Sequence, residues 1–212
     1  MALQTWLAFF VACWVISLSP GAGAIASMSS GLQYGFWRGY WNALGLQIGL
    51  ALQIAVVAAG VGAILSASAT AFAAIKWFGV AYLVWLAIKQ WRALPGDIAA
   101  EAGTGVRPIG RPLTLVLRGF LVNASNPKAV VFMLAVLPQF IDPHQPLLAQ
   151  YLIIGVTMIT VDLIVMAGYT GLAARVLRAL RTPRQQRLMN RTFAGLFVGA
   201  AALLASVQRV AH

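Results

Sequence analysis

The sequence predicts an all-α membrane protein of six transmembrane helices, arranged as two inverted three-helix repeats in which helices 1 and 4 are broken. Of its 212 residues, 61% are hydrophobic and only 9% are charged, whereas soluble domains carry about 45–50% apolar and about 25% charged residues. The apolar residues fall into six runs of roughly membrane-spanning length. The first and the fourth of these runs each contain a proline flanked by polar or small residues.

The predicted helices leave no room for a second folded domain, so we expect one transmembrane domain over residues 1–212. We place the first repeat at about residues 1–90, a Gly- and Pro-rich cytoplasmic linker at about 91–112, and the second repeat at about 113–212. The first apolar run lacks the basic start of a secretory signal, so we expect it to be retained as a helix. The six spans are predicted at about Leu3–Ser27, Tyr40–Leu65, Ala69–Lys89, Leu113–Phe140, Leu147–Ala174 and Thr192–Val207.

The basic residues predict how the chain is oriented in the membrane. They gather in the predicted loops one, three and five, whereas the other side carries only Lys76 and Arg209. Cytoplasmic loops of membrane proteins carry an excess of Lys and Arg. We therefore expect a multi-pass protein with both termini outside the cytoplasm. The same placement favours membrane lipids over nucleic acid as the partner of the net charge of +11.

The fourth span is interrupted in its middle by polar residues and a proline. Asn123 and Asn126 precede Pro127, and Lys128 follows it. Proline has no N–H and its ring clashes with the preceding turn, so a helix must kink or break there. Polar groups at membrane depth are costly unless they line a cavity or find a partner. The interruption therefore predicts half of a transport site.

The first span carries a similar interruption at Ser19, Pro20 and Gly21. Because each half contains three spans, the second half must cross the membrane upside down relative to the first, an arrangement known in secondary transporters. The two prolines would then face each other near the midplane. Backbone groups freed at such breaks can bind the carboxylate and the ammonium of a zwitterion. The alternative is that each proline merely kinks a packed helix.

Asp162 is the one acidic residue within a predicted span. An isolated carboxylate in the membrane costs too much free energy to stay ionised without a partner. Two roles are open: a proton-coupling acid, or a purely structural ion pair with Lys128. Gln47 and Gln53 on the second span can each bond across helices, and we expect them to serve in packing.

The composition argues against three other classes of protein. A metal-cation exporter, the nearest alternative, needs clustered carboxylates, His or thiolates, whereas the chain has one Cys, Cys13, and no His within the predicted spans. An intramembrane enzyme needs a nucleophile–base pair or a metal motif within the spans, and the sequence has neither. A non-transporting scaffold would not need two broken helices in equivalent places. We therefore expect no metal, no cofactor and no catalytic residue.

Motifs in three spans point to one family. They are Ser19-Pro20-Gly21 in the first span, Lys76-x-x-Gly79-x-x-Tyr82-Leu83 in the third, and Gly119–Phe132 followed by Leu137-Pro-Gln-Phe140 in the fourth. Together they resemble the signatures of the lysine exporter/homoserine–threonine exporter (LysE/RhtB) family, over nearly the whole chain. The resemblance implies proton-driven export of amino acids or their derivatives across the bacterial inner membrane, and it allows homo-oligomers.

The sequence also departs from the family pattern. Ala22 and Gly23 stand where the family usually has Pro and then Asn or Asp, and Gln53 stands where a His is common. These departures leave the substrate open. The residues and the resemblance together predict a proton-coupled amino-acid exporter that works by alternating access. Its predicted central site consists of Ser19, Pro20, Gly21, Asn123, Asn126, Pro127 and Lys128, with Asp162 as the coupling acid or as the counter-ion of Lys128.

Overall fold

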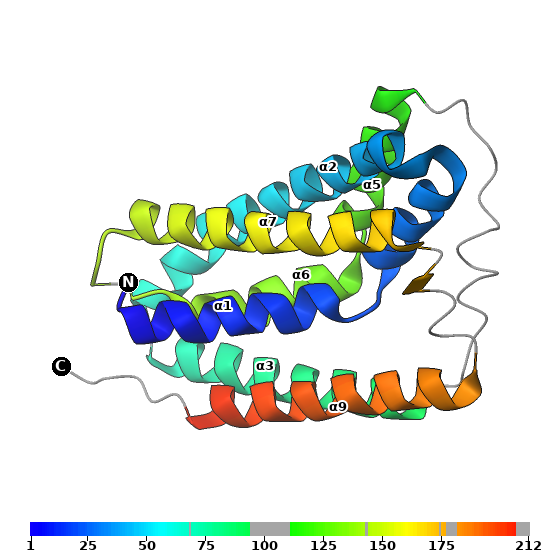
Figure 1. Cartoon of the computed structure of the whole chain (residues 1–212). Helices are drawn as coiled ribbons and strands as arrows, with labels where there is room; N and C mark the ends of the chain where they lie inside the picture. Colours follow the sequence, from blue (N-terminus) through cyan, green and yellow to red (C-terminus); the bar gives the residue numbers. More distant parts are fainter. Residues whose placement is uncertain (68, 94–110, 143, 174, 177–181, 207–212) are drawn as a thin grey trace.

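A computed structural model describes residues 1–67, 69–93, 111–142, 144–173, 175–176 and 182–206. The regular elements in these ranges are helices, without a strand, as predicted for an all-α membrane protein. Most of the helices run along one direction in an elongated bundle, and α5 crosses that direction steeply (Figure 1). They are α1 (Leu3–Leu18), α2 (Ala22–Ala67), α3 (Ala69–Arg92), α5 (Pro112–Ala124), α6 (Pro127–Val136), the 3₁₀ helix η1 (Leu137–Phe140), α7 (Leu147–Gly171) and α9 (Pro183–Ser206).

The first two predicted spans are divided differently in the structure. The helix stops at Leu18 and resumes at Ala22, and α2 then runs through the whole of the predicted first loop. Only Gly35 departs from helical geometry within α2, with φ 72° and ψ 175°. Glycine has no Cβ and adopts a positive φ at little cost. The predicted loop between Ser27 and Tyr40 is therefore wrong, because a sharp bend at one glycine replaces it.

The second half of the chain follows the prediction more closely. The fourth predicted span is divided into α5 and α6, and α7 covers most of the fifth. The sixth helix begins at Pro183, well before the predicted Thr192. Proline suits the first position of a helix because the N–H that it lacks has no partner there. The early turns of α9 carry exposed arginines, which hydrophobicity alone does not assign to a helix.

Two helices in the described part of the chain are long and apolar enough to cross a membrane on their own: α2, between Ala22 and Gly60, and α7. The helices α1 and α5 are apolar but shorter. Each of them ends at one of the two interruptions, so its length reflects the break and not a lack of apolar sequence.

The helices form three layers in Figure 1. The helix α2 packs against α5 and α7, and α3 packs against α9. Between these layers lie α1 and α6, with α1 in contact with α7 and α6 in contact with α3. At the breaks, Ser19 is buried, whereas Leu18 and Ser125 are exposed, so each break is enclosed by the bundle on part of its surface only.

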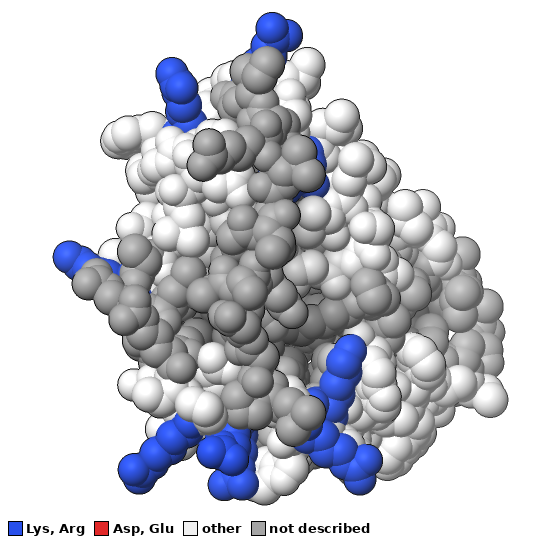
Figure 2. Space-filling model, turned by 90° about the vertical axis from the view of Figure 1, so that its right-hand side faces the viewer, with Lys and Arg blue, Asp and Glu red and all other residues white. Residues whose placement is uncertain are grey.

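One end of the bundle is basic. The start of α1 and the end of α9 lie at one end, and the bend of α2 and the start of α9 lie at the other (Figure 1). Viewed from the second end, the described surface shows Lys and Arg side chains and no acidic side chain (Figure 2). The start of α1 and the end of α9 thus lie opposite the basic end, as the predicted orientation requires.

Glycines bring the backbones of α2 and α5 into direct contact. A methyl group at Gly45 would lie 2.0 Å from the carbonyl oxygen of Val116, and one at Gly119 would lie 2.0 Å from that of Asn42. Small residues at helix crossings allow such close approach in membrane proteins. The crossing holds the end of α5, and with it the second break, against α2.

We predict that Gly119→Ala destabilises the protein, because the added methyl group has backbone on its far side and no side chain that could yield. Overpacking of this kind costs about 1–3 kcal/mol or more, which lowers the thermal midpoint by on the order of 5 °C. The control is Gly155→Ala on α7, where an added methyl group meets nothing within 4 Å. Thermal unfolding of the two purified variants in detergent checks the prediction, and equal midpoints would contradict it.

Candidate functional site

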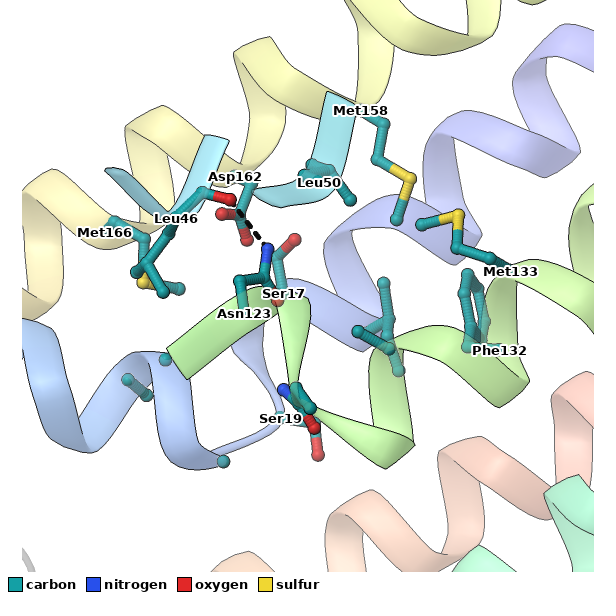
Figure 3. Close-up of a pocket in the computed structure, with 16 residues that line it drawn as sticks. Ser17, Ser19, Leu46, Leu50, Asn123, Phe132, Met133, Met158, Asp162 and Met166 are labelled. Carbon is teal, nitrogen blue, oxygen red and sulfur yellow. Dashed lines mark hydrogen bonds between the residues drawn. The ribbon is translucent and has the colours of Figure 1, made fainter. Parts of the chain in front are cut away.

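A cavity of about 80 Å³ lies where the two helix breaks meet (Figure 3). Its wall includes Ser19 and Gly21 from the first break, Asn123 and Asn126 from the second, and Asp162 from α7. A buried water needs about 10–15 Å³ of such space, so the cavity has room for several waters or for part of a small solute. Predicted site residues from three distant segments of the chain therefore line one cavity.

The remainder of the wall is mainly apolar. Figure 3 shows Asp162, Asn123 and Ser17 close together, with Leu46 and Met166 to one side of them and Met158 and Met133 to the other. The large apolar lining residues are Ile16, Leu46, Leu50, Phe132, Met133, Met158 and Met166. Methionine side chains are flexible and adapt to irregular apolar shapes. The cavity is thus suited to a small molecule that combines polar groups with an uncharged apolar part.

The first break follows from Pro20. The Ser19 N–H still donates to the carbonyl of Val15, at 3.2 Å, but Pro20 has no N–H with which to continue the helix. The carbonyl of Leu18 in the last turn of α1 accepts a hydrogen bond from the Tyr169 hydroxyl, at 2.7 Å. The chain then turns into α2, whose first turn contributes Gly23 and Ala24 to the wall of the same cavity as Gly21.

The second break follows from Pro127 in the same way. A continuous helix would use the N–H of residue 127 to bond the carbonyl of Asn123, and proline has none. That carbonyl accepts instead from the Asn126 N–H, at 3.0 Å, and from Nε2 of Gln53, at 2.7 Å. The Ser125 hydroxyl caps the end of α5 by donating to the Leu121 carbonyl, at 2.6 Å.

The side chain of Asn123 ties this break to α2. Its Nδ2 donates to the carbonyl of Leu46, at 2.7 Å (Figure 3). Gly49 on α2 lies so close that a methyl group there would come within 3.0 Å of the Asn123 Cβ. Asn123 therefore stands at the tight crossing of α2 and α5 and reaches the cavity from it.

Asp162 meets a glutamine of α2. The Nε2 atom of Gln47 donates to Oδ2 of Asp162 at 2.6 Å, and the Gln47 side chain is buried. The hydrogen bond is short, as expected when the acceptor is a carboxylate. Its predicted partner, Lys128, has a side chain outside the described part of the structure, so the ion pair with Lys128 stays a prediction.

Three predicted site residues are not placed in the cavity wall. Pro20 is partly exposed beside it, where its role is to end α1. The side chains of Pro127 and Lys128 lie outside the described residues. Within the described part of the chain, no three His, Cys, Asp or Glu side chains gather as a metal ion requires, and Cys13 is a buried core residue.

Comparison with known proteins identifies the family. The family described as LysE type translocator matches residues 14–208. The chain belongs to that family. The LysE/RhtB resemblance predicted from the motifs is thereby confirmed, and the chain is a translocator of a bacterial membrane and not an enzyme. No solved structure matches it.

Several bacterial relatives resemble this translocator along almost its full length. A homoserine/homoserine lactone efflux protein of Salmonella typhi is 44% identical, over 98% of this chain and 99% of its own. An uncharacterized membrane protein of Vibrio cholerae is 43% identical, over 98% and 100%. A leucine efflux protein of Enterobacter sp. (strain 638) is 31% identical, over 97% and 96%.

Sequence reasoning missed Ser17, which lines the cavity, and three further polar residues around it. Gln47 and Gln53, expected to serve in packing, bond to Asp162 and to the second break, and Tyr169 bonds to the first. One signal was available: Pro127 leaves the carbonyl four residues earlier without its helical donor, so a side-chain donor near Asn123 was to be expected. Which side chain supplies it depends on the helix crossing, which the sequence does not reveal.

Proposed function

We propose that this translocator exports amino acids or their derivatives from the cytoplasm, coupled to protons and by alternating access. The observation that carries the proposal is the meeting of both helix breaks and one acidic residue at a single cavity. Relatives named for efflux of homoserine, homoserine lactone and leucine support small substrates with uncharged side chains. The apolar cavity wall is compatible with such side chains.

Substrate recognition uses the polar groups of the cavity. The ammonium group of the substrate approaches Asp162, because opposite charges attract strongly where little water is present. The carboxylate or a carbonyl group lies toward the start of α2, after Gly21, since helix N-termini favour negative charge. The other residues proposed to form the site are Ser19, Pro20, Asn123, Asn126, Pro127 and Lys128.

Proton coupling in this proposal rests on Asp162. A carboxylate within the bundle needs either a proton or a cation, and the ammonium of a substrate is a cation. The site therefore holds a proton or a substrate but not both, which is the simplest form of exchange. Gln47 keeps the carboxylate oriented toward the cavity in both states.

The proposal also keeps the predicted inverted repeats and orientation. Residues of about 1–90 form the first repeat and residues of about 113–212 the second, with the basic end in the cytoplasm and both termini in the periplasm. The shared position of the start of α1 and the end of α9, with the basic residues at the opposite end, supports this orientation. Homo-oligomers are compatible with the proposal, which needs only one chain for the site.

Alternating access requires that the cavity be closed toward at least one side. Toward the basic end, α2 and α7 are in contact at Gly31, where an added methyl group would lie 2.1 Å from the Thr170 carbonyl oxygen. Between this contact and the cavity, the Ser27 hydroxyl donates to the sulfur of Met166, at 3.3 Å. The hydroxyls of Ser30 and Thr170 are buried there without a hydrogen-bond partner. Unpaired buried hydroxyls are costly, so separation of α2 from α7 would hydrate them and open a cytoplasmic path.

We predict that Asp162→Asn abolishes gradient-driven transport, because the amide keeps the size of the side chain but cannot exchange a proton. In proteoliposomes with an imposed pH gradient, uptake of labelled homoserine or leucine should fall more than tenfold. The control is Asp142→Asn, an exposed carboxylate in the turn before α7, which should transport at the wild-type rate. Unchanged gradient-driven transport by Asp162→Asn would refute the coupling role.

We further predict that Gly31→Ala holds the cytoplasmic side of the cavity open, because its methyl group cannot fit against the backbone of α7. Transport should fall about tenfold or more, and a cysteine introduced at Ser30 in a Cys13→Ala background should gain labelling by a membrane-impermeant maleimide from the cytoplasmic side. Gly168→Ala is the matched control, because its methyl group meets nothing within 4 Å. Equal labelling in the two variants would contradict the proposed gate.

A further inference from the structure

We propose that Gln53 and Tyr169 are positioning residues that fix the two helix breaks at the cavity, each acting from the opposite half of the chain. The transport measurement that tests this proposal rests on the proposed export function. Its geometry rests on two hydrogen bonds, from Gln53 Nε2 to the Asn123 carbonyl and from the Tyr169 hydroxyl to the Leu18 carbonyl, each 2.7 Å long.

The acceptor of Gln53 is the carbonyl that the second break deprives of its donor. Pro127 has no N–H for the carbonyl of Asn123, and the backbone donors that reach it, Ser125 N–H and Asn126 N–H, come from the turn itself. Gln53 is buried on α2 and supplies a donor from another helix. Without Gln53, the carbonyl oxygen of Asn123 would have one hydrogen-bond donor fewer. The chain could compensate by rotating this carbonyl toward another donor, and that rotation would move Asn123.

The acceptor of Tyr169 lies at the end of the helix that precedes the first break. Leu18 is the last residue of α1, and the last carbonyls of a helix have no donor within that helix. The Tyr169 hydroxyl comes from α7 to fill that role. The same helix, two turns earlier, carries Asp162, so the position of the first break is fixed relative to the proposed coupling acid.

The two bonds cross between the halves in opposite directions. Gln53 belongs to the second helix of the first half and bonds the first helix of the second half. Tyr169 belongs to the second helix of the second half and bonds the first helix of the first half. Each break is therefore fixed by a hydrogen bond from the other half. The cavity keeps its shape only while the two halves keep their relative positions.

Tyr40 offers a matched comparison within the same protein. Its hydroxyl also donates to a backbone carbonyl of another helix, that of Leu163 at 3.0 Å. Leu163 lies in the middle of α7, however, where the carbonyl already accepts a helical N–H bond. Loss of the Tyr40 hydroxyl removes one hydrogen bond, but the Leu163 carbonyl keeps its helical donor and both helix breaks keep their partners.

The test compares Tyr169→Phe with Tyr40→Phe, and Gln53→Leu with Gln53→His, which retains a ring N–H donor. For uptake of labelled homoserine by proteoliposomes, we expect Tyr169→Phe and Gln53→Leu to raise KM about tenfold, the effect of one lost hydrogen bond, with Vmax within about threefold of wild type. Tyr40→Phe should keep the wild-type KM, and Gln53→His should recover most of it. Equal KM values for Tyr169→Phe and Tyr40→Phe, or for Gln53→Leu and wild type, would overturn the proposal.

A second readout does not depend on transport. Hydrogen–deuterium exchange of the amides after each break, at residues 22–24 and 128–130, should quicken at least fivefold in Tyr169→Phe and Gln53→Leu respectively, and not in Tyr40→Phe. If wild-type protein transports no amino acid but these exchange rates change as expected, the export function fails and the positioning role stands. Unchanged exchange after both breaks would overturn the positioning role even in an active exporter.

Discussion

The structure depends on two places where proline removes a helical hydrogen bond inside an apolar bundle. At Pro20 and Pro127 the backbone must stop being a helix, and the freed groups need partners because no water is available in a membrane interior. The chain supplies them from neighbouring helices, with Tyr169 at the first break and Gln53 at the second. The remaining space between the breaks is the cavity. The polar site is thus a consequence of the same interruption that weakens the two helices.

Backbone contacts at glycines fix the positions of the helices around these two breaks. The backbones of α2 and α5 touch at Gly45 and Gly119, and those of α2 and α7 touch at Gly31. Backbone contact leaves little freedom, so Asn123 and Asp162 are brought to the same cavity from helices that are distant in sequence. The two crossings differ in their place along the bundle: one stabilises the second break, and the other lies between the cavity and the basic end.

The breaks and most of the helices were predictable because single residues dictate them. A proline breaks a helix at its own position, so the two breaks could be located from the sequence. The apolar runs have the length of a membrane span, which located most of the helices. The bend at Gly35 was mistaken for a loop because a run of small residues is compatible with either. The bond between Gln47 and Asp162 was not predictable, since a partner on another helix depends on the crossing angle and register. The ion pair of Asp162 with Lys128 stays a prediction.

The central claim is that Asp162 exchanges a proton for the ammonium of the substrate. The most direct test measures proton release when homoserine is added to the purified protein in a weakly buffered detergent solution near pH 7. A cation bound beside the carboxylate favours its ionised form, so the account predicts release of up to one proton for each substrate bound, and none from Asp162→Asn. Binding of homoserine by the wild-type protein without any release of protons would contradict it.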